Sequence, residues 1–339
     1  MKTSILIIYT GGTIGMVKDP VTGSLKPFDF DHILKQVPEL KNFGFELTSI
    51  AFDPLIDSSN LNPEVWIRIA NLIKENYEKY EGFVVLHGTD TMAYSASALS
   101  FMLENLGKPV VFTGSQLPIG MLRTDGKENL ITAIEIAADY KNGKAIVPEV
   151  CVLFENKLFR GNRTTKHNAE YFNAFYSYNY PDLAKVGINI HYNNAVIRNV
   201  SDGMFSINTN LDMNIAILKL FPGINKQTVD AILNIEGLRA VVMETYGAGN
   251  APTDEWFIDS IKDAISRGVI IYNVTQCPSG SVNMGLYETG VILRDIGVVS
   301  GYDITTEGAI TKLMFLLGQP LDSDKIIFYL NKSIKGELC

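Results

Sequence analysis

The stretch FVVLHGTDTMAYSASALSFMLENLGKPVVFTGSQ, residues 83–116, decides the fold class of this protein. Two short apolar runs rich in valine, at 83–86 and 110–113, flank a segment with helical spacing at 91–105. A strand, a helix and a second strand in this order are typical of parallel strands joined by a crossover helix. We therefore expect a parallel sheet covered by helices.

The same alternation continues along the chain. Further buried strands are expected at 5–9, 150–154, 216–220, 240–243 and 269–274. Further helices are expected at 63–80, 127–140, 254–267 and 307–318. This order predicts the α/β fold class for the whole chain.

The length of 339 residues predicts two domains, because single hydrophobic cores stop growing near roughly 250–300 residues. The segment 178–212 is polar and rich in asparagine, and its short alternating pieces predict an antiparallel excursion followed by a connector. We expect an N-terminal α/β domain at 1–195, with a doubly wound and mostly parallel sheet. A linker at 196–215 leads to a smaller C-terminal α/β domain with a parallel sheet at 216–339.

Composition excludes several classes of protein. A formal net charge of -8 argues against a nucleic-acid partner, since binding to phosphates depends on basic patches. No window reaches the roughly 18 apolar residues that a membrane span requires, and the first apolar run is too short for a secretory leader. Three widely spaced cysteines predict neither a disulfide framework nor a metal knuckle, and they favour a cytoplasmic location.

The glycine-rich stretch YTGGTIGM, residues 9–16, follows the first expected strand. It is not a phosphate loop, because no lysine follows Gly15, and it lacks the first glycine of a dinucleotide fingerprint. The glycines allow a sharp turn that leaves Thr13 at the carboxyl edge of the sheet, where ligands bind in such folds. The alternative is that the glycines form only a tight turn, which Thr13 caps.

Similar polar chemistry follows other strands. Thr89 and Asp90 place a hydroxyl beside a carboxylate after the strand at 83–86, although either residue could simply cap the next helix. The further polar strand ends carry Ser115, Tyr246 with Asn250, and Gln276 with Cys277. Five such ends predict a shared polar crevice.

Two loops add candidate groups. The loop before the helix at 63–80 contains Asp57, Ser58 and Ser59, which could equally be turn or capping residues. The segment RGNRTTKHN, residues 160–168, is unusually basic for this acidic protein. It is either a solvated basic face or a segment from which one lysine turns inward, pairs with an acid such as Asp90 and activates a hydroxyl.

Zinc and serine-hydrolase sites are excluded by missing motifs. The chain has no H-E-x-x-H and no G-x-S-x-G, and its four histidines do not have metal-ligand spacing. We expect no metal and no cofactor. Any catalytic mechanism must therefore use threonine, lysine and aspartate.

Together, the motifs YTGGTIGM, DSS, HGTDTM, RGNRTTK, YGAGN and ITKLMFLLGQPLD resemble the bacterial-type L-asparaginases, most closely the cytoplasmic type I branch. The resemblance extends from the first strand to the end of the chain. The pair TGGTI and HGTDTM is much more specific than either motif alone. The resemblance implies an asparagine amidohydrolase that converts L-asparagine and water to L-aspartate and ammonia.

The resemblance also implies roles for individual residues. Thr13 would attack the side-chain amide carbon and form a β-aspartyl ester. Thr89, Lys166 and Asp90 would form a second group, in which the lysine lowers the proton affinity of the threonine. The residues implied in substrate binding are Asp57, Ser58, Ser59, Thr89, Asp90 and Ser115.

Two departures from the family pattern affect these implications. Family members often carry a tyrosine in the loop after the nucleophile, whereas residues 17–28 contain none. Tyr287 matches a tyrosine that some type I relatives supply from a neighbouring subunit, which implies a homodimer or homotetramer with the active site near the subunit interface. An effector site would contain Thr165, Glu244 and Cys277, but Glu244 stands where an arginine is expected, so we expect little cooperativity.

Three alternatives remain open at this stage. A mixed asparaginase/glutaminase is the nearest, because one methylene in a pocket discriminates by only about 1–3 kcal/mol. The asparaginase-like subunit of a tRNA-dependent amidotransferase shares these motifs but carries an extra N-terminal domain, whereas the first expected strand here begins near residue 3. A non-catalytic amino-acid-binding module is the third.

Overall fold

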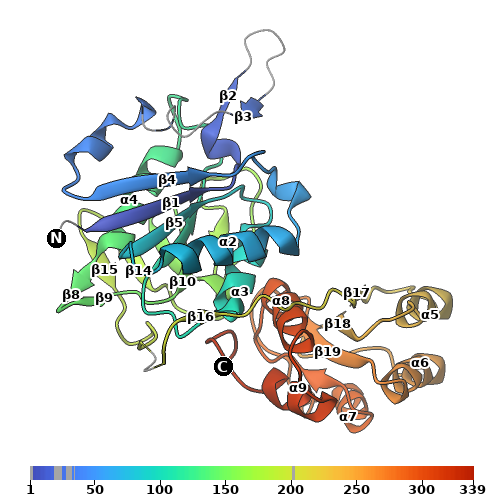
Figure 1. Cartoon of the computed structure of the whole chain (residues 1–339). Coiled ribbons are helices and arrows are strands. Elements are labelled where there is room, and N and C mark those ends of the chain that lie inside the picture. Colours follow the sequence, from blue (N-terminus) through green and yellow to red (C-terminus); the bar gives the residue numbers. More distant parts are fainter. Residues whose placement is uncertain (1–2, 19–24, 28–32, 34, 201–202) are drawn as a thin grey trace. The chain divides into compact units, whose positions relative to one another are not determined.

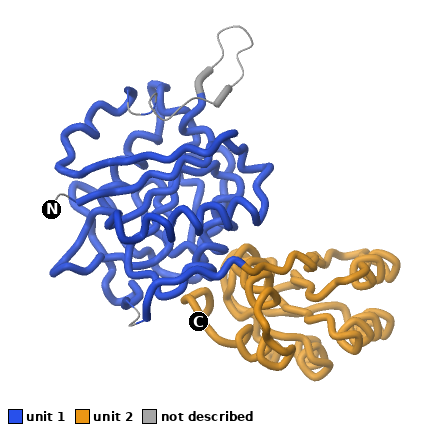
Figure 2. The backbone as a smooth tube through the Cα atoms, in the orientation of Figure 1, with its two compact units in different colours: residues 1–209 blue, residues 210–339 orange. Residues whose placement is uncertain are grey.

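A computed structural model describes residues 3–18, 25–27, 33, 35–200 and 203–339. The chain forms two compact units, residues 1–209 and 210–339 (Figure 2). The division falls inside the stretch 196–215 that was expected as a linker. The first unit extends this far because β16 (Ser206–Ile207) pairs antiparallel with β6 (Leu103–Glu104).

The first unit is built on an eight-stranded sheet of order β15-β14-β11-β10-β7-β5-β1-β4 (Figure 1). Its parallel part consists of β1 (Ser4–Tyr9), β4 (Glu46–Ala51), β5 (Gly82–Leu86), β7 (Val110–Thr113) and β10 (Val150–Phe154). Its antiparallel extension consists of β11 (Lys157–Arg160), β14 (Ala184–Val186) and β15 (Ile190–Tyr192). The predicted doubly wound, mostly parallel sheet with an antiparallel excursion is confirmed.

Among the residues that the structure describes, the helices α2, α3 and α4 cover this sheet. Helix α2 (Pro63–Asn76) begins with proline in its first turn, and the Asn62 side chain caps it by accepting a hydrogen bond from Val65 N. Helix α3 (Met92–Met102) is buried around nearly its whole circumference, so its sequence is apolar or small at almost every position. Helix α4 (Gly126–Ala138) presents apolar residues to the sheet.

Helix α4 lies on the opposite face of the sheet from α2 and α3 (Figure 1). Its Leu130 and Ile134 share one apolar cluster with Ile5 and Ile7 of β1, whereas no residue of α3 belongs to that cluster. The α3 and α4 crossovers both advance the sheet in the same direction, from β5 to β7 and from β7 to β10. They therefore have opposite hands, and one of them departs from the right-handed rule for parallel crossovers.

The second unit has a parallel sheet of order β17-β18-β19-β20. Its strands are β17 (Ile215–Lys219), β18 (Ala240–Thr245), β19 (Ile270–Thr275) and β20 (Val299–Ser300). Its helices are α5 (Lys226–Leu233), α6 (Glu255–Ser266), α7 (Glu288–Asp295), α8 (Thr306–Leu317) and α9 (Ser323–Leu330). The C-terminal α/β fold with a parallel sheet is confirmed.

Within the described part of the chain, no helix combines the length and apolar character needed to cross a bilayer.

Candidate active site

The candidate site lies where β1 and β5 end, side by side and in parallel register. Strand β1 leads into a short helix η1 (Thr13–Gly15), and β5 leads into Thr89 and Asp90. The chain leaves β1 towards β4 on one side and continues from β5 towards β7 on the other. Ligands bind at such reversals of strand order, because the connecting loops diverge there and leave a crevice.

Glycines allow the loops at this edge to touch. A methyl group on Gly12 would lie 2.5 Å from the backbone nitrogen of Gly88, and one on Gly88 would lie 2.5 Å from Ser58 Oγ. Gly12 also has a φ of 96°, a conformation that side chains with a Cβ rarely adopt. The Thr13 turn, the turn before Thr89 and the Ser58 loop are therefore in direct contact, and glycine is needed for that approach.

Lys166 bonds to both the hydroxyl of Thr89 and the carboxylate of Asp90. Its Nζ donates to Thr89 Oγ1 at 2.8 Å and to Asp90 Oδ1 at 2.8 Å. Thr89 is buried, and the lysine side chain is 17% exposed against 64% for Asp90. A buried hydroxyl, a largely buried cation and an accessible carboxylate are thus held in one hydrogen-bonded row.

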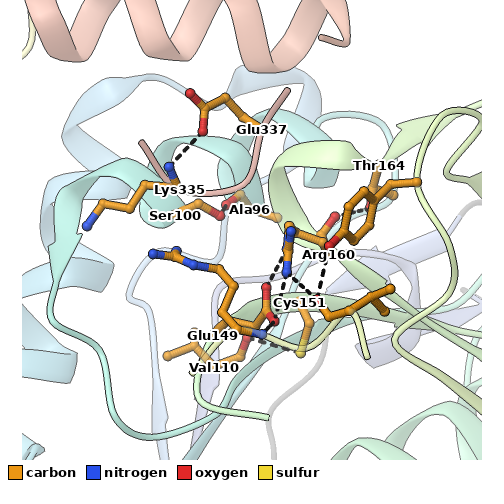
Figure 3. Close-up of polar contacts among 12 residues, drawn as sticks. Ala96, Ser100, Val110, Glu149, Cys151, Arg160, Thr164, Lys335 and Glu337 are labelled. Atoms are coloured by element: carbon orange, nitrogen blue, oxygen red, sulfur yellow. Dashed lines mark hydrogen bonds and ion pairs between the residues drawn. The ribbon is translucent and has the colours of Figure 1, made fainter. Parts of the chain in front are cut away.

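The segment that carries Lys166 is anchored by buried arginines, so it is not a solvated basic face. Arg160 Nε donates to Glu149 Oε2 at 2.6 Å, and both side chains are 4% exposed (Figure 3). Arg163 is also buried, with its guanidinium carbon 5.1 Å from the centre of the Tyr180 ring. Only His167 of the cluster is exposed. Lys166 follows these anchors in β12 (Thr165–Lys166).

His87 is a structural residue of this edge and is uncharged near neutral pH. Burial lowers the pKa of His87 to about 4. Gly88 O can only accept, so the proton of the neutral ring is on Nδ1, which donates to that carbonyl at 2.7 Å and fixes the peptide immediately before Thr89. Nε2 therefore accepts a hydrogen bond from Ser95 Oγ at 2.9 Å, and the same hydroxyl oxygen accepts one from Trp66 Nε1.

The loop at 57–59 is held by its own side chains. Asp57 Oδ1 accepts hydrogen bonds from Ser59 N and Ser59 Oγ, each at 2.9 Å, and so caps η3 (Ser58–Asn60). Ser58 is buried, and its carbonyl accepts a hydrogen bond from Thr91 Oγ1 at 2.8 Å. Of these three residues, Ser58 lies against the turn that precedes Thr89, whereas Asp57 and Ser59 are exposed.

At the strand end after β7, the neighbouring side chains of Ser115 and Gln116 have different partners. Ser115 is buried, and its hydroxyl donates to Leu117 O at 2.6 Å within its own loop. Its neighbour Gln116, which was not singled out as a site residue, accepts a hydrogen bond from Thr89 Oγ1 at 3.3 Å. The only available signal in the sequence was its position at a strand end beside a serine.

Two family descriptions match the chain. "Asparaginase, N-terminal" matches residues 4–198, and "Glutaminase/Asparaginase C-terminal domain" matches residues 214–329. The chain belongs to the asparaginase family. The matched segments contain all the candidate residues described above.

Individual relatives agree with this assignment to the asparaginase family. L-asparaginase 1 of Escherichia coli (strain K12) is 43% identical over 350 residues, which cover 99% of this chain and 98% of that protein. The solved structure of L-asparaginase I from Vibrio cholerae matches with a TM-score of 0.90 and 42% identity and covers 100% of both chains. The thermostable L-asparaginase from Thermococcus kodakarensis, also a solved structure, matches with a TM-score of 0.90 and 32% identity and covers 99% of both chains. The resemblance to the type I branch of the asparaginases is thereby confirmed.

The remaining residues that the asparaginase resemblance implied lie in two units. Tyr287 lies at the N-cap position of α7 in the second unit, makes no capping hydrogen bond with its side chain, and is 53% exposed. Glu244 forms a salt bridge with Lys219 at 3.1 Å. Cys277, which follows β19, is exposed. Thr165 belongs to the first unit, next to Lys166.

The loop in which asparaginases often carry a tyrosine falls largely outside the described residues, at 19–24 and 28–32. Among the residues that the structure describes, no three histidines, cysteines, aspartates or glutamates are arranged to hold a metal ion. The described side chains at this edge offer hydroxyl, ammonium, carboxylate and amide groups.

Proposed function

We propose that this protein hydrolyses L-asparagine to L-aspartate and ammonia, with Thr13 as the nucleophile and Thr89, Lys166 and Asp90 as the activating group. Membership of the asparaginase family supports an amidohydrolase. The observation that carries the assignment of residues is the position of Lys166 Nζ, 2.8 Å from both Thr89 Oγ1 and Asp90 Oδ1.

The reaction proceeds in two balanced steps. In the first, Thr13 Oγ attacks the side-chain amide carbon, a β-aspartyl ester forms, and the proton of Thr13 leaves with the amide nitrogen as ammonia. In the second, water adds to the ester, which releases L-aspartate and restores the Thr13 hydroxyl. Thr13 is internal to the chain, so no free α-amino group is available as its base.

The activating group replaces that base. Lys166 donates to Thr89 Oγ1, and this lowers the proton affinity of the Thr89 oxygen. Asp90 holds the lysine in place through the second hydrogen bond. Thr89 then activates the Thr13 hydroxyl or the attacking water, which contributes about 10²–10⁴-fold in comparable acid–base steps.

Substrate binding uses the groups around this row. Asp90 is accessible and carries the charge that an α-ammonium group needs. Ser58, at the contact with Gly88, faces the α-carboxylate. Backbone N–H groups of the glycine turns stabilise the developing oxyanion, by about 3–4 kcal/mol per donor in comparable sites.

The test measures ammonia released from asparagine by the wild type and by Thr13→Ala and Thr89→Val. We expect loss of nearly all activity in Thr13→Ala and a strong reduction in Thr89→Val. A wild type that releases no ammonia would contradict the function, and a Thr13→Ala variant that keeps most of the rate would contradict the nucleophile. The same measurement with glutamine decides whether the enzyme is a mixed asparaginase/glutaminase.

Cytoplasmic location and homo-oligomer formation complete the proposal. Three cysteines without disulfide bonds support a reducing compartment. Leu286 and Tyr287 are neighbouring apolar side chains, 59% and 53% exposed, and they support a subunit contact through which Tyr287 reaches the site of the neighbouring protomer. Mixing Thr13→Ala with Tyr287→Phe subunits tests this contact: activity recovered in the mixture supports it, and no recovery contradicts it.

A further inference from the structure

We propose that Gln116 is a positioning residue that sets the direction of the Thr89 hydroxyl and ties the segment after Lys166 to the sheet edge. The proposal rests on the function proposed above. It adds a residue that joins three loops of the site through one side-chain amide.

The hydrogen-bonding capacity of each partner fixes the orientation of the Gln116 amide. Tyr171 O can only accept, so the group that faces it at 3.1 Å must be the Nε2 amino group. The amide oxygen Oε1 therefore faces Thr89 Oγ1, at 3.3 Å. A carbonyl oxygen only accepts, so Thr89 must donate its proton to Gln116.

This bond determines how Thr89 meets Lys166. The lysine ammonium has donors but no acceptor, so the Thr89 proton cannot point towards it. With the proton directed to Gln116, the Thr89 oxygen presents a lone pair to Lys166 Nζ at 2.8 Å. Gln116 therefore holds the hydroxyl in the orientation in which the lysine lowers its proton affinity most.

The backbone of Gln116 is itself held by the start of α4. Gln116 N donates to both oxygens of Asp125, at 3.1 and 3.0 Å, and Leu117 N donates to Asp125 Oδ1 at 3.2 Å. Asn129 Nδ2 donates to Gly114 O at 2.9 Å. Burial raises the pKa of the Asp125 carboxyl, although these hydrogen bonds oppose the shift. The side-chain amide of Gln116 therefore extends from a loop whose backbone is held by these hydrogen bonds.

The other partner belongs to a turn at 167–174 that is closed by its own hydrogen bonds. Asn168 Oδ1 accepts from Tyr171 N at 2.9 Å, and His167 N donates to Ala174 O at 2.9 Å. This turn follows Lys166 directly in the chain. A displacement of Tyr171 would be transmitted to the lysine, so the Gln116 bond helps to place both members of the Thr89–Lys166 pair.

Three variants separate positioning from general stability. Gln116→Met keeps the length of the side chain but removes its acceptor and its donor. Gln116→Glu keeps an acceptor towards Thr89 and adds a negative charge, which favours the protonated forms of nearby groups. Gln319→Met is the matched control in the second unit, where Gln319 Nε2 also donates to a backbone carbonyl, Phe315 O at 2.8 Å.

The experiment measures kcat and KM for asparagine across the pH range, with thermal melting as the check on folding. We expect Gln116→Met to lower kcat by about 10-fold or more with a smaller change in KM. We expect Gln116→Glu to move the acid limb of the kcat/KM profile to higher pH and to recover above that limb more activity than Gln116→Met. Gln319→Met should leave the kinetics unchanged.

Two results would overturn the inference: a folded Gln116→Met variant with kcat within twofold of the wild type, or a Gln116→Glu variant whose acid limb does not move. If Gln116→Met does not fold, the pH profile of Gln116→Glu decides alone. These failures differ from a failure of the proposed function, because they would occur in a wild type that releases ammonia and loses that activity in Thr13→Ala.

Discussion

In both units, the parallel strands are followed by polar side chains, but these side chains have different partners. At the edge of the first sheet, Lys166 comes from a distant segment and bonds to both Thr89 and Asp90. At the edge of the second sheet, Glu244 bonds to Thr306 and to Lys219. The same kinds of residue therefore form a hydrogen-bonded row, which we propose is catalytic, in one unit, and pairs within the second unit in the other.

The five polar strand ends belong to two different sheets: those after β1, β5 and β7 lie at one sheet edge, and those after β18 and β19 lie at the edge of the other sheet. In the second unit, Thr245 Oγ1 donates to Asn273 Oδ1 at 2.6 Å, and Gln276 Nε2 donates to Leu220 O at 2.6 Å. These polar groups find hydrogen-bond partners within their own unit, and the bonds stabilise the strand ends.

The largest expected effect is on kcat, and it distinguishes two lysines that each bond to a carboxylate at a strand end, Lys166 and Lys219. We expect Lys166→Met to lower kcat for asparagine by about 10³-fold, or about 4 kcal/mol, because Thr89 loses its cation. Lys219→Met is the control, since Lys219 is 66% exposed and forms its salt bridge with Glu244. Ammonia release measures both. Equal losses in the two variants would remove the distinction between the edges.

A second effect concerns acid stability, since all four histidines lie in the first unit. Burial lowers the pKa of His87 from 6.5 to about 4, so the unfolded chain binds a proton more readily. This contribution to stability is complete above about pH 6.5 and is lost as the pH falls to about 4, by about 3 kcal/mol.

Denaturant unfolding between pH 4 and 7 measures this contribution. We expect His87→Gln to have a flatter dependence of the free energy of unfolding on pH than the wild type. The exposed His167 provides the control through His167→Gln, which should keep the wild-type slope. A wild-type slope in His87→Gln would show that the buried ring does not carry the effect.

A third effect compares two glycines with the same φ. Gly12 and Gly223 both have a φ of 96°, but a methyl group would meet the Gly88 backbone at Gly12 and nothing within 4 Å at Gly223. The positive φ should cost each alanine variant about 1–3 kcal/mol of stability, and the clash with the Gly88 backbone should add to the cost at Gly12. We expect only Gly12→Ala to lower kcat/KM, by about 10²-fold, because it displaces the turn that carries Thr13. Similar kinetics in the two variants would contradict this.

The smallest expected effect is an absence of cooperativity. Glu244 already accepts a hydrogen bond from Thr306 Oγ1 at 2.7 Å and pairs with Lys219, so this position offers a negative charge to an incoming carboxylate. We expect a hyperbolic dependence of the rate on asparagine concentration, with a Hill coefficient near 1. A clearly sigmoidal curve would contradict this prediction.

Most of the fold was predictable because its buried strands are continuous apolar runs. The runs in β1, β5, β7, β10, β17, β18 and β19 and the helices α2, α3, α4, α6 and α8 were all located. Strand β4 was not predicted, because it lies at the edge of the sheet and its residues are half-buried or exposed, without an apolar run. Helices α5, α7 and α9 were not predicted, because each has only eight residues, too few for a clear helical period.

The sequence by itself determined the α/β alternation and the residue types at each strand end, and its length led to the expectation of two domains. These features depend on local periodicity and on chain length, which a single sequence contains. It also contained the motifs by which the asparaginase family is recognised.

Only the tertiary structure decided which of these groups meet. Lys166 reaches Thr89 across 77 positions of sequence, Ser115 turns into its own loop, and Gln116 takes the place beside Thr89. The opposite hands of the α3 and α4 crossovers were likewise invisible in the pattern of apolar residues. Contacts between distant segments depend on the paths of the loops and on the packing of the anchors beneath them, such as the buried Arg160–Glu149 pair. No local pattern contains that information.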